Sequence, residues 1–233
     1  MTEQAQYTPA PNLMVATCLR PHPDKIGEFM PLWEERNKVI ARKDLVWEAA
    51  FAAVGRKDHA AYMQHRERAE ALQLEEELLS AQMRPLQVAA WQTTAPNLVT
   101  NLGRNDLLDK YWRSAAYTQT GVMGLKGTGA PAAGDTQASH AGWLEVGLAN
   151  APVYTGNRKA VTMGAAAAQS SVSPQQNYAI TSTGTVSGIF MNNGGSATKD
   201  DTTGTLVSAV NFTGGDEAVN NLDSLLVTYT FNG

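Results

Sequence analysis

Hydrophobic residues change their spacing along this chain, from a helical period in the first part to a period of two in the last part. Between residues 24 and 83, apolar positions recur every three or four residues, which is typical of amphipathic helices. After residue 117, apolar and polar residues alternate, most clearly over 225–231, as in a strand with one buried face. The pattern predicts an α+β protein, in which an N-terminal helical region precedes an all-β antiparallel sandwich domain.

Helix start signals occur twice before residue 55. Asp24 is placed to cap a helix that begins at Lys25, and Pro31 either kinks or restarts this helix because proline has no amide hydrogen. Asp44 is a second plausible cap, which opens a further helix over 45–54. Short helices of this kind make a thin core unless a neighbour helps to cover them.

The longest predicted helix runs from about His59 to Met83, with Asp58 as its cap. Its apolar residues fall on two neighbouring stripes, which together are wider than the seam of a coiled coil. The first stripe consists of Tyr62, Ala69, Leu72, Leu79 and Met83, and the second of Ala71, Leu74, Leu78 and Ala81. Such a helix either packs in a small bundle or lies at a subunit interface, and both can hold at once. Leu72 and Leu79 are its candidate interface residues.

Prolines at positions 9, 11, 21 and 23 predict that residues 1–23 form an extended arm. Such an arm is either a loose tail or becomes ordered on another surface. Its apolar side chains can be buried on a neighbouring subunit, and these candidate interface residues are Leu13, Met14, Val15 and Leu19.

Three regions follow from these patterns: an extended arm over 1–23, a helical assembly or attachment region with its connector over 24–96, and a β-sandwich domain over 97–233. A connector is expected over 84–100, and a short helix capped by Thr100 or Asn101 after it. The candidate strands of the sandwich are 121–126, 143–148, 154–163, 178–181, 186–191, 206–212 and 225–231.

Composition narrows the classes of function. The 233 residues carry a formal net charge of −4, so the chain has no basic excess for nucleic-acid binding. No apolar run approaches the length of a membrane span, and the first residues lack the features of a signal peptide. We therefore expect a protein made in the cytoplasm, with neither nucleic acid nor membrane as a partner.

Candidate chemistry is sparse. Asp135, Ser139 and His140 have the residue types of a catalytic triad, but turn hydrogen bonds explain a loop of this composition better. The histidines and the single cysteine do not have the spacing of a metal site, and the glycines after Lys126 lack the helix that a nucleotide fingerprint needs. We expect no catalytic residues, no metal and no cofactor, and therefore no enzyme.

One binding function has candidate residues in the β region. Trp143 opens a strand after a glycine-rich loop and could form a platform on which a carbohydrate stacks, although packing in the sandwich core explains it better. Tyr154 and Tyr178 are the other candidate stacking residues.

The run from Asn97 to Phe231 resembles a β-domain of tailed-bacteriophage virion structural proteins, which is often described as tail-fibre-like. Its most specific part is Asp-Thr-Gln-Ala-Ser-His-Ala-Gly-Trp at 135–143. The other matching stretches are 97–101, 107–109, 122–127, 184–190, 202–206 and 223–231. The resemblance implies a structural role in the virion and supplies no catalytic residues, and residues 1–96 lie outside it.

The leading hypothesis is an accessory structural protein of a tailed-phage virion, attached at the neck or tail through residues 1–96. The alternatives are a capsid decoration protein and, from another class, a host-surface carbohydrate-binding module. The expected partners are portal, neck, tail or capsid proteins, together with further copies of the chain in a ring or trimer.

Overall fold

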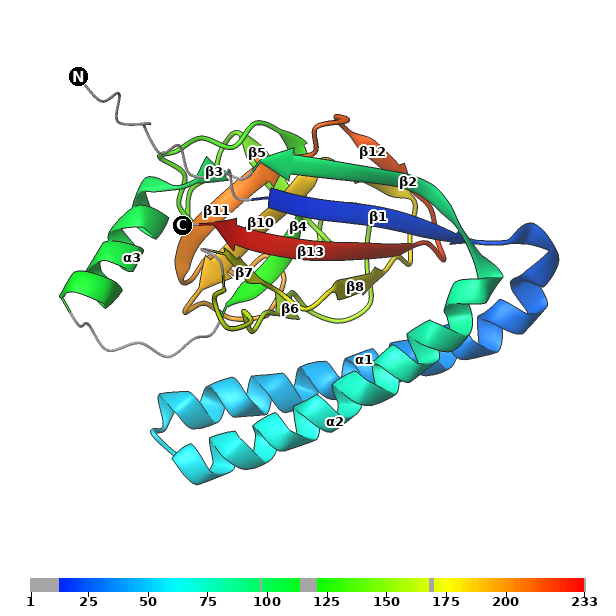
Figure 1. The fold of residues 1–233 in the computed structure, drawn as a ribbon, viewed down its shortest axis with the longest axis horizontal. Helices are drawn as coiled ribbons and strands as arrows, with labels where there is room; N and C mark the ends of the chain where they lie inside the picture. The colour runs from blue at the N-terminus through cyan, green and yellow to red at the C-terminus, as the bar shows by residue number, and fades with distance from the viewer. Residues whose placement is uncertain (1–12, 97, 114–120, 168–169, 233) are drawn as a thin grey trace, which may run out of the picture.

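Two antiparallel β-sheets and a long helical hairpin make up the fold (Figure 1). The computed structural model describes residues 13–96, 98–113, 121–167 and 170–232. The first sheet has the order β2-β1-β13-β7, and β8 also pairs with β13. Its strands are β1 (Leu13–Pro21), β2 (Gln87–Pro96), β7 (Ser170–Val172), β8 (Gln176–Ala179) and β13 (Ser224–Asn232).

The second sheet has the order β3-β11-β10-β4-β5, and β6 also pairs with β4. Its strands are β3 (Leu98–Val99), β4 (Val122–Gly129), β5 (Trp143–Val146), β6 (Lys159–Ala160), β10 (Gly188–Asn193) and β11 (Thr205–Asn211). A separate two-stranded ladder joins β9 (Gly184–Val186) to β12 (Glu217–Val219). The α+β fold with antiparallel sheets is as the sequence pattern predicts.

The main core lies between the two sheets, because alternate residues of each strand point inward. On β13, Leu225, Val227 and Tyr229 are buried in this core, which confirms the alternation read from the sequence. Met14 on β1 and Ile189 on β10 belong to the same cluster, so both sheets contribute to it.

The helical hairpin is inserted between two neighbouring strands of the first sheet. Helix α1 (Ile26–Gly55) leads away from β1, and α2 (His59–Met83) leads back to β2, with short 3-10 turns at Pro23–Lys25 and Arg84–Leu86. Because an antiparallel pair of helices returns the chain to its starting point, β1 and β2 can pair directly across this insertion. The helices are therefore part of the β-domain topology and do not form a separate region over 24–96.

Residues 13–21 are a sheet strand, which corrects the expectation of an extended arm for that part of the chain. β1 lies between β2 and β13 and is paired to both, and Met14 and Cys18 are fully buried. The strand alternates small or apolar inward residues with partly exposed ones, but its partner β13 is about two hundred residues away, which the local pattern does not reveal. The arm predicted over 1–12 lies outside the described residues.

The connector expected over 84–100 is also corrected, because most of it is the strand β2. Two of the predicted helix caps are confirmed, but the cap predicted at Asp24 is wrong, because Asp24 lies within a 3-10 turn and α1 begins at Ile26 without a side-chain cap. Asp58 accepts a hydrogen bond from the amide of Ala61 at 3.0 Å, and Thr100 accepts one from Gly103 at 3.0 Å as the cap of α3 (Asn101–Trp112). Both caps confirm the sequence prediction.

Asp44 is not a helix cap, because α1 runs continuously through it. Its carboxylate accepts a hydrogen bond from the amide of Asn157 at 2.6 Å and so fastens α1 to the sandwich. Gly156, with φ of 79°, lies so close to Asp44 and Ile40 that a Cβ atom there would overlap them. The contact between hairpin and sandwich therefore depends on a glycine at this turn.

Candidate assembly surface

The outer side of α2 carries an exposed apolar ridge, which consists of Ala71, Leu74, Leu78 and Ala81. All four residues are exposed, and the two leucines retain 59% and 58% of their accessible surface. Their spacing of three, four and three residues is that of one seam of a coiled coil. We call this set the α2 ridge. It is the second of the two stripes that the sequence pattern separates.

The first stripe of α2 is the side that packs within the hairpin. Ala69 and Met83 are buried, and Leu72 and Leu79 are half-buried beside them. Leu72 and Leu79, the candidate interface residues of this helix, therefore have much of their surface covered by their own chain. Whether Leu72 and Leu79 take part in an interface stays a prediction, because periodicity alone does not tell which side of a helix meets α1.

The rim of the α2 ridge is acidic. Glu70, Glu75 and Glu77 flank it, and two of them have a cation nearby: Arg66 Nε lies 2.8 Å from Glu70, and Arg42 Nη2 lies 3.1 Å from Glu75. These ion pairs are exposed and contribute little to stability. Their effect is to define the charge that an approaching partner meets.

The candidate interface residues of the N-terminal segment lie in β1. Met14 is fully buried between the sheets, which removes it from any contact with another subunit. Val15 and Leu19 are half-buried on the opposite face of the strand. The side chain of Leu13 lies outside the described part of the structure.

The three candidate glycan-stacking residues are buried, which contradicts that role. Trp143, Tyr154 and Tyr178 retain 2%, 1% and 0% of their accessible surface. Trp143 packs against Phe190, and the rings of Tyr154 and Tyr178 meet edge to face with centroids 5.0 Å apart. Large aromatic side chains bury more apolar area than any others, so core packing prevailed at all three positions.

The segment that carries the most specific resemblance is held together by its own residues. The indole Nε1 of Trp143 donates to Asp135 Oδ2 at 2.9 Å, and the ring of His140 stacks on Trp143 with centroids 4.0 Å apart. Asp135 also accepts from the amide of Ala132 at 2.8 Å, as in a turn. The carboxylate therefore orients the indole and not the imidazole, which is not the arrangement of a catalytic triad.

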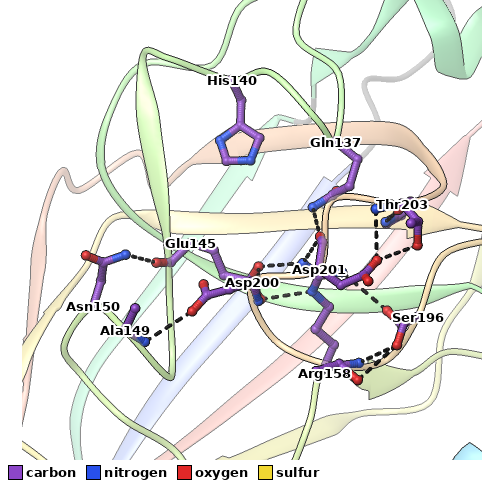
Figure 2. Close-up of polar contacts among 12 residues, drawn as sticks. Gln137, His140, Glu145, Ala149, Asn150, Arg158, Ser196, Asp200, Asp201 and Thr203 are labelled. Carbon is purple, nitrogen blue, oxygen red and sulfur yellow. Dashed lines mark hydrogen bonds and ion pairs between the residues drawn. The ribbon is translucent and has the colours of Figure 1, made fainter.

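A buried ion pair fastens the loops at this end of the sandwich (Figure 2). Arg158 Nε and Nη2 donate to the two carboxylate oxygens of Glu145 at 2.9 and 2.6 Å, and both side chains are almost fully buried. Arg158 also donates to the carbonyls of Ser196 and Asp201, and the amide of Asp200 donates to Glu145 at 3.0 Å. These bonds engage the guanidinium of Arg158 on several sides, so we interpret the network as one that holds the loops in place.

The cavity between hairpin and sheet holds charged residues that sequence reasoning missed. Arg36 and Lys43 are buried on α1, among the apolar residues Phe29, Ile40 and Val46. Lys43 Nζ pairs with the buried carboxylate of Glu76 on α2. The sequence contains a signal for this pair. Arg36 and Lys43 are seven residues apart and therefore lie on the same apolar side of the helix, where a buried charge needs a polar partner or a cavity.

Metal binding and membrane insertion were also considered as functions of the described residues. Among the described residues, no group of three or more His, Cys, Asp or Glu side chains is placed to hold a metal ion. None of the helices in the described ranges is both long enough and apolar enough to cross a membrane.

Comparison with known proteins gives no relative: no family model, no curated protein and no solved structure matches the chain.

Proposed function

We propose that this chain is an accessory structural protein of a tailed-phage virion, attached at the neck or tail through the helical hairpin, with the sandwich as a projecting module. The observation that carries the proposal is the α2 ridge. It is an exposed apolar seam, with the spacing of a helix-packing surface, on the hairpin that lies along one side of the sandwich (Figure 1). The resemblance of residues 97–231 to virion β-domains supports the same role.

Burial of the ridge supplies a modest free energy per copy. Leu74 and Leu78 each have more than half of their surface left to bury, which is worth about 1–2 kcal/mol per side chain. That amount is too small for a stable one-to-one complex after the cost of association. A symmetric virion ring presents many equivalent sites, so multivalent attachment makes weak contacts sufficient.

The charge of the rim favours a partner of different sequence. Glu70 and Glu75 each have an arginine of their own chain nearby, so Glu77 is the flanking carboxylate that would repel its counterpart if two α2 ridges faced each other. We therefore propose that the ridge packs on a helix of another virion protein whose flanking residues are basic. Several copies of the chain then take their ring or trimer arrangement from the symmetry of that partner.

The decisive experiment compares virions that carry different versions of the chain. In particles of the phage that encodes it, the wild-type chain should appear in a cryo-EM reconstruction at the neck or tail, in multiples that match the local symmetry. The double variant Leu74→Lys with Leu78→Lys should fold normally but be lost from particles, because its cationic side chains cannot be buried in an apolar contact.

The matched control is Leu144→Lys with Leu148→Lys, which changes two leucines of similar exposure on the sandwich. This control should be incorporated as well as the wild type. Hundreds of copies on the shell would indicate capsid decoration instead. Absence of the wild-type chain from purified particles, or equal incorporation of the ridge variant, would overturn the proposal. The carbohydrate-binding alternative is not retained, because its stacking residues are buried.

A further inference from the structure

A cavity of about 360 Å³ lies between the helical hairpin and the outer face of the first sheet. We call it the hairpin cavity. Side chains from both helices and from several strands line it, among them Arg36 of α1, Ser80 of α2, Gln87 of β2, Asn177 of β8, and Ser224 and Leu226 of β13. Most of its lining residues are polar or charged, although it lies between two surfaces that in most proteins would be closed by apolar packing.

Arg36 is the least satisfied charged group in this cavity. It retains 1% of its accessible surface, and its Nη1 donates to Ser224 Oγ at 3.3 Å. Its Nε and Nη2 are buried and have no hydrogen-bond partner among the described residues. Two unpaired donors on a buried cation are costly, so a native structure that keeps them needs a reason.

The guanidinium stays charged at neutral pH. Burial lowers the pKa of Arg36 to about 10, and the nearby carboxylate of Glu76 acts in the opposite direction. Glu76 does not saturate Arg36, since its hydrogen bond goes to Lys43. One edge of this buried cation therefore keeps two donors without an acceptor among the described residues.

The charges that surround Arg36 are predominantly positive. The cavity lining includes Lys43 of α1, Lys159 of β6 and Arg84 of the second 3-10 turn, against Glu76 and Glu77 of α2. Burial lowers the pKa of Lys159, and repulsion from Lys43 and Arg36 adds to that effect, while Asp44 and Glu76 oppose it. The cavity therefore has a local excess of cations in a chain of net charge −4.

We propose that the hairpin cavity binds a small oxyanion, a carboxylate or a phosphate group, through Nε and Nη2 of Arg36. These two nitrogens form one edge of the planar guanidinium and can donate two parallel hydrogen bonds to two oxygens of the same group. Asn177 Oδ1, also buried and unpaired among the described residues, provides an acceptor for a hydroxyl of the ligand. The inference does not depend on the virion role.

Binding is measured on the purified full-length chain by thermal unfolding and by calorimetry. Sodium phosphate and sodium acetate are the two probes, and sodium chloride at equal ionic strength is the reference. At a hundredfold excess over Kd, a ligand specific for the folded state should raise Tm by about 5–10 °C. The stronger of the two responses identifies whether phosphate or carboxylate is preferred.

Three variants locate the site. Arg36→Met should stay folded and lose the anion response, because it removes the donors along with an incompletely paired buried charge. Arg36→Lys should bind at least tenfold more weakly, since a point charge cannot replace the planar fork. Arg42→Met, an exposed arginine of the same helix, should respond as the wild type does.

NMR of the wild-type chain detects binding directly and does not depend on whether a variant folds. In the wild-type chain, NMR should show one arginine Nε–H resonance that shifts and saturates as the anion is added. The proposal is overturned if neither anion exceeds chloride in its effect on Tm, if Arg36→Met keeps the response, or if no arginine Nε–H resonance moves.

Discussion

The sandwich and the helical hairpin differ in how completely each satisfies its own side chains. In the sandwich, Trp143 is buried and hydrogen-bonded, and Arg158 has a carboxylate and two backbone carbonyls as acceptors. In the hairpin, Arg36 is buried with one acceptor in the described part of the chain. Exposed leucines do not separate the two regions, since Leu74 and Leu78 of the hairpin and Leu144 and Leu148 of the sandwich are similarly exposed. The comparison shows that one buried arginine is engaged on several sides by its own chain, whereas the other keeps two donors without a partner among the described residues.

The largest effect is expected from breaking the satisfied network of the sandwich. Arg158→Met should lower the free energy of unfolding by about 3–5 kcal/mol, because Glu145 is left buried without its counter-ion. Chemical denaturation followed by circular dichroism measures the loss. Adding Glu145→Gln to Arg158→Met should recover part of it. A loss below about 1 kcal/mol in the single variant would show that the network is not the fastening that we infer.

A smaller effect should appear in the pH dependence of stability. Burial lowers the pKa of Lys126 and of Lys199 to about 8, whereas an unfolded lysine titrates near 10.4. Between these values the two lysines bind more protons in the unfolded chain than in the folded chain, so they make the free energy of unfolding rise with pH. Burial raises the pKa of the Cys18 thiol, which acts in the opposite direction. We expect the two lysines to contribute a gain on the order of 1–2 kcal/mol between about pH 8 and pH 10.

Denaturation at a series of pH values tests this prediction. Lys126→Met should remove the share of the rise that Lys126 contributes, which separates it from other titrating groups. If stability is flat or falls across this range in the wild type, and Lys126→Met changes nothing, the buried lysines do not titrate as stated.

The smallest effect sharpens the comparison between the two buried arginines. Without added anion, Arg36→Met should change the free energy of unfolding by less than about 1 kcal/mol, because the guanidinium that it removes makes one hydrogen bond to the described residues. The same denaturation assay, run beside Arg158→Met, measures the contrast. Equal losses in the two variants would mean that Arg36 is as fully engaged as Arg158.

Local signals were enough to predict α2, the start of α3 and the class of fold, but they divided α1 into two helices. The boundaries of α2 follow from Asp58 and from the apolar period, and Thr100 marks the start of α3, because caps act within one turn of the chain. The alternation over 225–231 likewise fixes the inward face of β13, since successive side chains of a strand point to opposite faces.

Features that depend on distant partners could not be predicted in the same way. The prolines near residue 21 suggested an arm, whereas β1 pairs with β13 through contacts such as Met14 with Tyr229. The burial of Trp143 depends on Phe190 and His140, and the state of Arg36 depends on a cavity that two helices and a sheet enclose. A single sequence contains the residues of these contacts but not their pairing.

Photo-crosslinking in intact virions tests the central claim most directly. A photoreactive phenylalanine analogue is placed at Leu78 on the α2 ridge and, as the control, at Leu144 on the sandwich, both exposed leucines. The account predicts that position 78 crosslinks to a different virion protein, at a helix with basic flanking residues, and that position 144 does not. Crosslinks from position 144 alone, or none from position 78 in particles that contain the chain, would contradict it.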